Sequence, residues 1–130
     1  MSDRVVKIPG PNHPIAVEKI PGQVVVRVAG RKIAATNSAL SLREATLPPV
    51  TYIPRTDIDV ALLERSHHST YCPYKGDASY FSIPVAGDIG ENIAWSYEAP
   101  HPAMAVIKDH VAFYADRVAI GDPESNAAER

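Results

Sequence analysis

The sequence is poor in cysteine and in long hydrophobic runs. Cys72 is the only cysteine among 130 residues, which excludes a disulfide within the chain and fits a reducing compartment. No apolar run approaches the roughly 20 residues that cross a bilayer, and residues 1–7 lack the apolar core of a signal peptide. We therefore expect a cytoplasmic protein with no membrane partner.

An excess of charge of one sign is also missing. Lysine and arginine number 13 and aspartate and glutamate number 15, which gives a formal net charge of -2 and a pI near 6.2. Because nucleic-acid-binding domains present basic patches, we expect no nucleic-acid partner. Glycine-rich phosphate loops are absent as well, and the sequence identifies no cofactor.

The common motifs of metal sites are equally absent. The sequence contains neither a Cys-x-x-Cys pair nor a His-Glu-x-x-His motif. His67, His68 and Cys72 have a spacing that could chelate a metal ion, with His101 arriving from elsewhere. The alternative is an exposed pair of histidines in a loop, and we predict no metal site.

What the sequence contains in quantity is proline. Twelve prolines exclude a helical bundle, because each removes a backbone donor and breaks helix interiors. Between them lie short segments with the alternating residues of strands. These are 23–28 and 32–36, joined into a hairpin by a turn at 29–31, and 40–43, 50–53, 78–83, 92–97, 111–114 and 118–120. The pattern predicts a mainly β fold, a small antiparallel β-barrel or rolled sheet with one or two short helices.

Helix signals are limited to two short segments. Thr56 is a candidate N-cap for a helix over 57–65, since Asp59 completes a capping box with it. A second helical turn is predicted over 103–108. Along the chain we expect an extended segment at 1–14, a single β-barrel-like domain at 15–120 and a flexible tail at 121–130.

No aromatic residue precedes Tyr52. The six tyrosines, two phenylalanines and single tryptophan all lie between Tyr52 and Tyr114. In the strand predicted over 92–97, Trp95 and Tyr97 share one face, and buried Trp and Tyr need partners for their N–H and O–H groups. Trp95 is therefore either the core tryptophan of a small barrel or part of the wall of a pocket.

The run from Thr70 to Gly76 concentrates the reactive chemistry of the chain. A lysine ammonium close to a thiol favours the thiolate, so Lys75 could activate Cys72 as a nucleophile or contact a ligand itself. Pro73 at the second position of a turn would fix the two side chains relative to each other. Two plainer interpretations stay open: Cys72 is a small buried hydrophobe, or the run is a turn with no further purpose.

A second polar group follows Tyr52. Arg55 lies three residues further on, and its guanidinium could clamp a carboxylate or a phosphate through its planar fork. Arg55 could equally be a surface residue that pairs with Asp57 or Asp59.

Six blocks of the sequence occur in a characteristic order. They are Gly10-Pro11-Asn12-His13-Pro14-Ile15, Ala39-Leu40-x-Leu42-x-Glu44, Pro48-Pro49-x-x-Tyr52-Ile53-Pro54-Arg55-x-Asp57, Thr70-x-Cys72-Pro73-x-Lys75-Gly76, Ala94-Trp95-x-Tyr97-Glu98-x-Pro100 and Ala112-Phe113-Tyr114. Together they closely resemble the family of domain of unknown function 427. The resemblance runs from about Gly10 to Val118, and it implies a small, single-domain, mainly β fold found in bacteria and fungi.

That family also carries a nucleotidyltransferase label, which implies two metal ions held by neighbouring carboxylates beside a glycine-serine loop. Asp57 and Asp59 are the candidate pair in this chain, and no Gly-Ser precedes them. Many members of the family have aspartate where this chain has Ala35. If that acid belongs to a site, the site is altered in this protein.

The leading hypothesis is a domain that binds a small, anionic metabolite in an aromatic pocket. The pocket would be formed by Tyr52, Arg55, Cys72, Tyr74, Lys75, Trp95, Tyr97 and His101. If the domain is also an enzyme, we predict Cys72 as nucleophile, Lys75 as its electrostatic activator and His101 as acid or base. The alternatives are a nucleotidyltransferase, or a non-catalytic module that recruits a protein partner at a sheet edge. A homodimer is left open.

Overall fold

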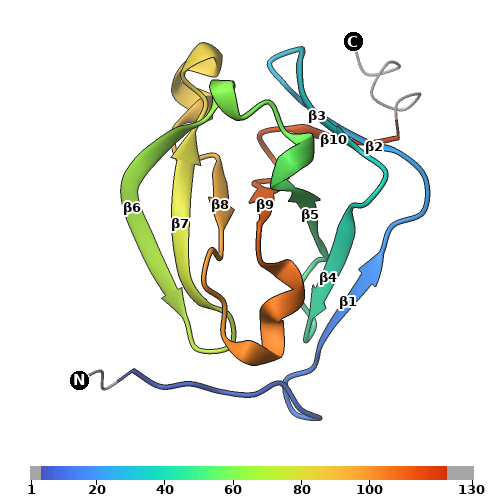
Figure 1. The fold of residues 1–130 in the computed structure, drawn as a ribbon, viewed down its shortest axis with the longest axis vertical. Helices are drawn as coiled ribbons and strands as arrows, with labels where there is room; N and C mark the ends of the chain where they lie inside the picture. The colour runs from blue at the N-terminus through green and yellow to red at the C-terminus, as the bar shows by residue number, and fades with distance from the viewer. Residues whose placement is uncertain (1–3, 123–130) are drawn as a thin grey trace.

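Two antiparallel β-sheets make up the fold (Figure 1). The computed structural model describes residues 4–122; its larger sheet has seven strands in the order β1-β4-β5-β9-β8-β7-β6, and its smaller sheet has three in the order β10-β2-β3. The strands are β1 (Ile15–Lys19), β2 (Val24–Val28), β3 (Arg31–Thr36), β4 (Leu40–Glu44), β5 (Val50–Pro54), β6 (Glu64–Cys72), β7 (Gly76–Ser82), β8 (Ala94–Ser96), β9 (His110–Phe113) and β10 (Ala119–Gly121). Short 3-10 helices connect them: η1 (Arg55–Asp57), η2 (Val60–Leu62), η3 (Pro84–Gly90) and η4 (Pro102–Ile107).

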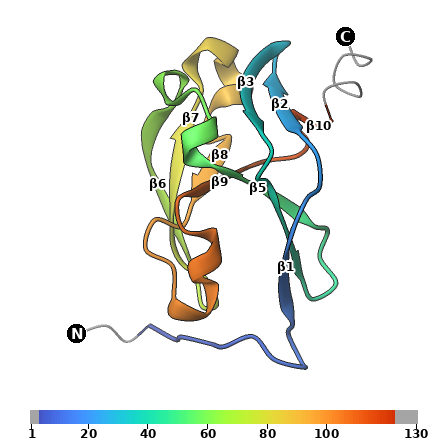
Figure 2. The same ribbon diagram turned by 45° about the vertical axis from the view of Figure 1, so that its right-hand side comes forward.

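The predicted mainly antiparallel β class is confirmed. Within residues 4–122 the order of the large sheet ends at β1 on one side and at β6 on the other, so the sheet is rolled but open. Figure 1 places these two strands at opposite sides of the molecule, and Figure 2 shows how the sheet bends between them. Of the two forms that the sequence predicts, the rolled sheet is the one observed, and a closed barrel is not.

The hairpin predicted over 23–36 is confirmed as β2 and β3. Both residues of its tight turn have positive φ, 51° at Ala29 and 81° at Gly30, as the twist of a two-residue hairpin favours. β10 pairs with the other side of β2. The valines of β2 are buried, and three of them, Val24, Val26 and Val28, pack with residues of β5, β7 and β9 into a core cluster between the two sheets.

Strand alternation divides the core into two clusters. On β7, Phe81 belongs to the cluster between the sheets, whereas its neighbour Tyr80 belongs to a second cluster on the other side of the strand. The second cluster holds several of the large rings, and Trp95 and Cys72 pack against it. Its buried members are Leu40, Leu42, Tyr52, Ala78, Tyr80, Tyr97, Met104, Ile107 and Ala112.

The helix predicted over 57–65 is wrong. The chain makes the two short turns η1 and η2 instead, and Ile58 between them is buried and forms an isolated bridge to Ala34 of β3. Thr56 caps no helix, since η1 has no side-chain cap, and Asp57 accepts a hydrogen bond from a threonine hydroxyl of β3 (2.6 Å). Burial of Ile58 against β3 overrides the local helix signals.

The sequence pattern also misses β6. Its nine residues are mostly exposed and polar because it is an edge strand, so they lack the apolar alternation by which the other strands are found. His67 and His68 lie on this strand rather than in a loop. β1, the other edge strand, is not predicted either, although Ile15 and Val17 alternate along it and pack against the second cluster. Of the segment expected to be extended at 1–14, residues 1–3 lie outside the described residues, and a turn closed by a bridge between Gly10 and His13 precedes β1.

The remaining predictions concern the C-terminal part. The helical turn predicted over 103–108 is observed as η4. The tail expected at 121–130 falls almost wholly outside the described residues, and Gly121 is the last residue of β10. No helix within residues 4–122 is long and apolar enough to cross a membrane.

Gly90, the last residue of η3, offers a test of how tightly this connection packs. A Cβ atom at Gly90 would clash with the carbonyl oxygen of Ile83, a backbone atom that cannot rotate away. We expect Gly90→Ala to lower the free energy of unfolding by roughly 2 kcal/mol, as overpacked sites do, measured by urea denaturation. Gly10→Ala is the matched control, because nothing lies within 4 Å of its Cβ position. Equal stability of the two variants would contradict this packing.

Candidate functional site

The turn between β6 and β7 presents Cys72 and Lys75 on one side. The Lys75 N–H donates to the Cys72 carbonyl oxygen (3.2 Å), which makes a β-turn with Pro73 at its second position, as predicted. Gly76 follows at φ +113°, a conformation that side chains rarely adopt, and a Cβ atom at this position would lie 3.4 Å from the carbonyl oxygen of Ala99. The turn is therefore held from outside by the segment that follows β8.

Lys75 is buried and forms an ion pair with Glu44. Its Nζ atom lies 2.5 Å from Glu44 Oε1, and the side chains of the lysine and the glutamate are 9% and 14% exposed. His13 Nε2 lies 2.7 Å from the other carboxylate oxygen, Oε2. Cys72 Sγ is a more distant neighbour of the ammonium, at 4.0 Å. One carboxylate thus holds a lysine from the β6–β7 turn and a histidine from the segment before β1.

The surroundings of Glu44 keep its carboxylate ionised. Burial acts to raise the pKa of this carboxyl group, but the hydrogen bonds and charges of Lys75 and His13 outweigh burial and hold the pKa below its usual value. The ammonium and the carboxylate therefore face each other as a charged pair at the edge of a tyrosine-rich cluster.

The ion pair lies at the wall of a cavity of about 200 Å³. Apart from Glu44 and Lys75, the cavity is lined by apolar and aromatic side chains, and Trp95 lies half-buried in its wall. The full lining is Leu42, Glu44, Leu47, Pro48, Val50, Tyr52, Lys75, Tyr80, Trp95, Tyr97 and Tyr114. Most of these residues come from β4, β5, β7 and β8, on the face of the large sheet that carries Tyr80.

Two of the tyrosines in this wall stay protonated. Burial raises the pKa of both Tyr52 and Tyr97 far above the usual tyrosine value. The Lys75 ammonium lies 5.9 Å from the centre of the Tyr97 ring, within the range of a cation–π contact. The phenols therefore act as neutral walls and hydrogen-bonding groups, and the charge in the cavity resides in the ion pair.

Two further hollows share lining residues with the cavity. A larger, mostly apolar hollow of about 540 Å³ shares Trp95, Tyr114, Leu47, Pro48 and Val50 with it. A more polar hollow of about 490 Å³ shares Tyr80 and Tyr114. Ring contacts run along these hollows, with centroid separations of 4.5 Å for His68 and Tyr80, 6.4 Å for Tyr80 and Trp95, and 4.7 Å for Trp95 and Tyr114. We call the three hollows together the aromatic groove.

Five of the predicted site residues come together here. Tyr52, Lys75, Trp95 and Tyr97 line the central cavity, and Cys72 packs beside them. Of the two interpretations that the sequence left open for Trp95, the structure favours the pocket wall, because the side chain is half-buried, packs against the second cluster and lines the cavity.

The other three predicted residues lie elsewhere. Tyr74 stacks on His13, with ring centroids 4.2 Å apart, and is not part of the cavity lining. Arg55 pairs with Glu98 rather than with Asp57 or Asp59.

His101 is held away from Cys72. Its Nε2 lies 3.1 Å from the hydroxyl of Tyr71. Tyr71 and Cys72 are successive residues of β6, so their side chains point to opposite sides of the strand. The structure therefore does not assemble the predicted trio of Cys72, Lys75 and His101.

Among the polar and aromatic residues around the central cavity, sequence reasoning missed His13, Glu44, Tyr80 and Tyr114. The sequence could have revealed Glu44, because this residue continues the alternation of Leu40 and Leu42 on β4. A carboxylate at a position whose neighbours point into the core needs a buried partner. No sequence pattern could have revealed His13, since the path of the N-terminal segment alone brings it to the site.

Comparison with known proteins places the chain in a family. A search of curated proteins finds no match. The sequence model of the family described as Domain of unknown function (DUF427) matches residues 16–122, which include the central cavity and the β6–β7 turn. The chain therefore belongs to the DUF427 family, as the order of its sequence blocks predicts.

Proposed function

We propose that this domain binds a small, planar, largely apolar molecule in the aromatic groove and recognises one polar group of it through the Glu44–Lys75 pair. The observation that carries the proposal is the position of this buried ion pair in the wall of an otherwise apolar cavity. Ligand sites of proteins combine such walls with a few polar groups that fix orientation.

The rings of the groove favour a flat ligand. Trp95 and Tyr114 are partly exposed, and their faces can stack on a planar group without displacing core residues. The central cavity of about 200 Å³ suits a single ring system, and the adjoining hollows leave room for substituents.

The charges at the site favour a neutral polar group over an anion. Lys75 is already paired with Glu44, and Arg55 lies outside the lining of the central cavity, so no uncompensated cation among residues 4–122 lines this cavity. A group that both accepts and donates hydrogen bonds, such as an amide or a ring N–H beside a carbonyl, can use the remaining Lys75 donors and Glu44 lone pairs. The anionic charge of the ligand stays a prediction of the sequence.

The first test uses Trp95 as the reporter, because it is the only tryptophan of the chain. Neutral planar probes such as indole, phenol and benzamide are titrated while the indole N–H resonance of Trp95 is followed by NMR. We expect saturable shifts. In Leu47→Glu the affinity should fall roughly tenfold, since a carboxylate at the mouth of the groove disfavours an apolar ligand.

Val85→Glu is the matched control for that variant. Leu47 and Val85 are 57% and 59% exposed, and Val85 lies outside the groove lining. Probes that bind wild type and both variants with equal affinity would refute the groove as the binding site.

A second test concerns the ion pair itself. Glu44→Gln leaves the buried Lys75 ammonium without its carboxylate, whereas Lys75→Met leaves Glu44 paired with His13. We expect Glu44→Gln to cost roughly 3 kcal/mol of unfolding free energy and Lys75→Met clearly less, measured by urea denaturation at pH 7.

The pH dependence of that difference has a definite sign. The pKa of Glu44 is lowered in the folded protein, so its stabilising effect is complete above the unfolded value of about 4.3 and is lost as the pH falls through the folded value. The advantage of wild type over Glu44→Gln should therefore shrink only at acidic pH. A constant difference down to pH 3 would contradict the pairing.

A second candidate function is covalent catalysis by Cys72, which the 4.0 Å separation between its Sγ and Lys75 Nζ supports. Against it, the nearer partner of the ammonium is Glu44, and His101 bonds Tyr71 instead. The nucleotidyltransferase alternative has still less support, because Asp57 and Asp59 flank the buried Ile58 at the bridge to β3. The interaction module at a sheet edge stays a prediction.

Alkylation separates the binding proposal from the catalytic one. Because Cys72 packs against the tyrosine-rich cluster, we expect iodoacetamide at pH 7 to react with it more slowly than with N-acetylcysteine. Lys75→Met should not slow the reaction further. A rate well above that of N-acetylcysteine, and reduced several-fold in Lys75→Met, would favour the catalytic candidate.

A further inference from the structure

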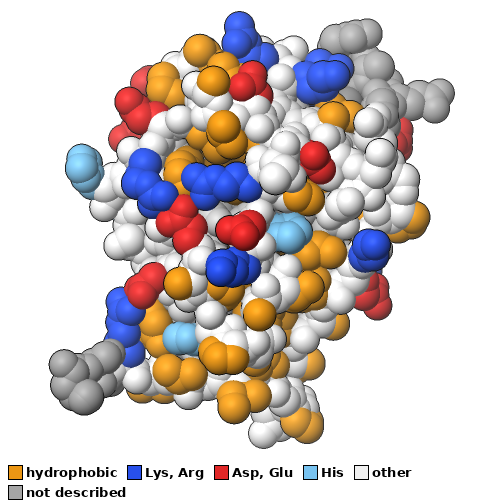
Figure 3. All heavy atoms as spheres, in the orientation of Figure 1, with side chains coloured by type: hydrophobic (Ala, Val, Ile, Leu, Met, Phe, Trp, Pro, Cys, Tyr) orange, Lys and Arg blue, Asp and Glu red, His pale blue; other side chains and the backbone are white. Residues whose placement is uncertain are grey.

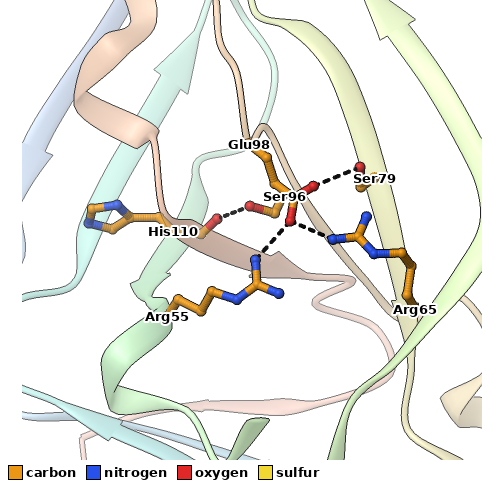
Figure 4. A network of polar contacts seen from close by, with 6 residues as sticks. All are labelled: Arg55, Arg65, Ser79, Ser96, Glu98 and His110. Atoms are coloured by element: carbon orange, nitrogen blue, oxygen red, sulfur yellow. Dashed lines mark hydrogen bonds and ion pairs between the residues drawn. The ribbon is translucent and has the colours of Figure 1, made fainter.

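Two arginines converge on one carboxylate outside the aromatic groove (Figure 4). Arg55 Nη1 and Arg65 Nη2 lie 2.9 Å and 2.7 Å from the same oxygen, Oε2 of Glu98. The Ser79 hydroxyl donates to the other oxygen of Glu98, Oε1, at 3.2 Å. Figure 4 shows the two guanidinium groups reaching Glu98 from different sides.

The two arginines come from distant strands of the large sheet. Arg55 directly follows β5, Arg65 belongs to β6, and β9, β8 and β7 lie between these strands. In a flat sheet four strand spacings would separate them by roughly 19 Å. In the folded protein the sheet is rolled, and the pairing register of β6 shifts just after Arg65. Both features go together with the short distance between the two arginines. Their meeting is thus a product of tertiary structure and not of local sequence.

Phe81 holds both guanidinium groups in place. The Cζ atoms of Arg55 and Arg65 lie 5.1 Å and 5.0 Å from the centre of the same Phe81 ring, which is itself buried in the core. Cation–π contacts with a fixed ring order the arginines before any ligand arrives. Because the side chains are already ordered, binding an anion would cost less side-chain entropy.

The charge at this place is unbalanced. Within residues 4–122, Glu98 is the carboxylate with which either arginine forms an ion pair, so two positive charges face one negative charge. Each guanidinium carries five N–H donors and uses one of them on Glu98. The hydrogen bonds from Arg65 and Arg55 outweigh burial and lower the pKa of Glu98, which therefore stays ionised.

Both arginines are open to solvent, with side chains 33% and 54% exposed for Arg55 and Arg65. Figure 3 shows basic and acidic side chains gathered near the centre of one face of the molecule. Ser79 and Phe81 alternate with Tyr80 along β7, so the arginine pair lies on the side of that strand opposite to the aromatic groove. A ligand at the arginines would be independent of one in the groove.

We propose that Arg55 and Arg65 form a second binding site, one for the phosphate group of a small phosphorylated molecule. The unused N–H groups of the two planar forks donate to the phosphate oxygens, which is the bidentate geometry in which arginine prefers such anions. Glu98 positions the two guanidinium groups and sets the net charge of the site at one positive unit.

The test is a titration of the full chain with inorganic phosphate against sodium chloride of the same ionic strength. The arginine side-chain N–H resonances are followed by NMR, and the melting temperature is recorded in parallel. We expect saturable binding to wild type and at least fivefold weaker binding to Arg65→Gln. Glu98→Gln removes the negative charge and should tighten binding roughly fivefold, the effect of one unit charge about 4 Å away in water.

Arg4→Gln is the matched control, since Arg4 also pairs with a carboxylate, that of Asp77, and lies over an aromatic ring, at 4.2 Å from the centre of Tyr71. Its binding of phosphate at the Arg55–Arg65 site should equal that of wild type. If Glu98→Gln does not fold, Arg65→Lys takes its place: it keeps the charge but loses the planar fork, and should bind more weakly than wild type.

Two results would overturn the proposal. One is an equal phosphate response in wild type and Arg65→Gln. The other is a folded Glu98→Gln protein, or Arg65→Lys in its place, that binds phosphate as wild type does. In either case the two arginines and Glu98 form a structural ion pair only.

Discussion

The site depends on one buried ion pair that bridges the open roll of the large sheet. Glu44 ends β4, next to one edge of the sheet, and Lys75 lies in the turn between β6 and β7 at the other edge. No backbone ladder pairs these two edges directly within residues 4–122, and the Glu44–Lys75 ion pair is one of the contacts that connect them. Because both charges have lost most of their water, their separation would leave the Lys75 ammonium without its carboxylate and Glu44 with His13 as its remaining partner.

Alternation along single strands gives the molecule two chemically different faces. Residues of β7 point in turn to the tyrosine-rich cluster and to the core between the sheets, and β8 does the same with Trp95 and Ala94. A rolled sheet therefore separates an apolar hollow from a polar cluster by the thickness of one strand. That arrangement allows two ligand chemistries in a small domain without a second core.

Features that depend on residues close together in the sequence could be predicted, whereas features that depend on contacts between distant strands could not. The β2–β3 hairpin and the turn at Pro73 are fixed by neighbouring residues, and the sequence predicts both correctly. β6 could not be found, because an edge strand is stabilised by pairing with β7 and needs no apolar pattern of its own. At the site, the sequence pointed to Tyr52, Trp95 and Tyr97 but not to Tyr80 or Tyr114. The partners of Lys75, Arg55 and His101 depend on which strands the roll brings together.

The N-terminal segment has a consequence for where the domain begins. His13 precedes β1 and holds the carboxylate that Lys75 also holds, Lys7 N–H donates to the carbonyl of Pro73, and the Tyr71 hydroxyl donates to that of Val5. The family match starts only at residue 16. A fragment cut at that boundary would lose the first residue of β1 and one of the two hydrogen-bonding partners of Glu44, so the side chains around this carboxylate extend beyond the family match.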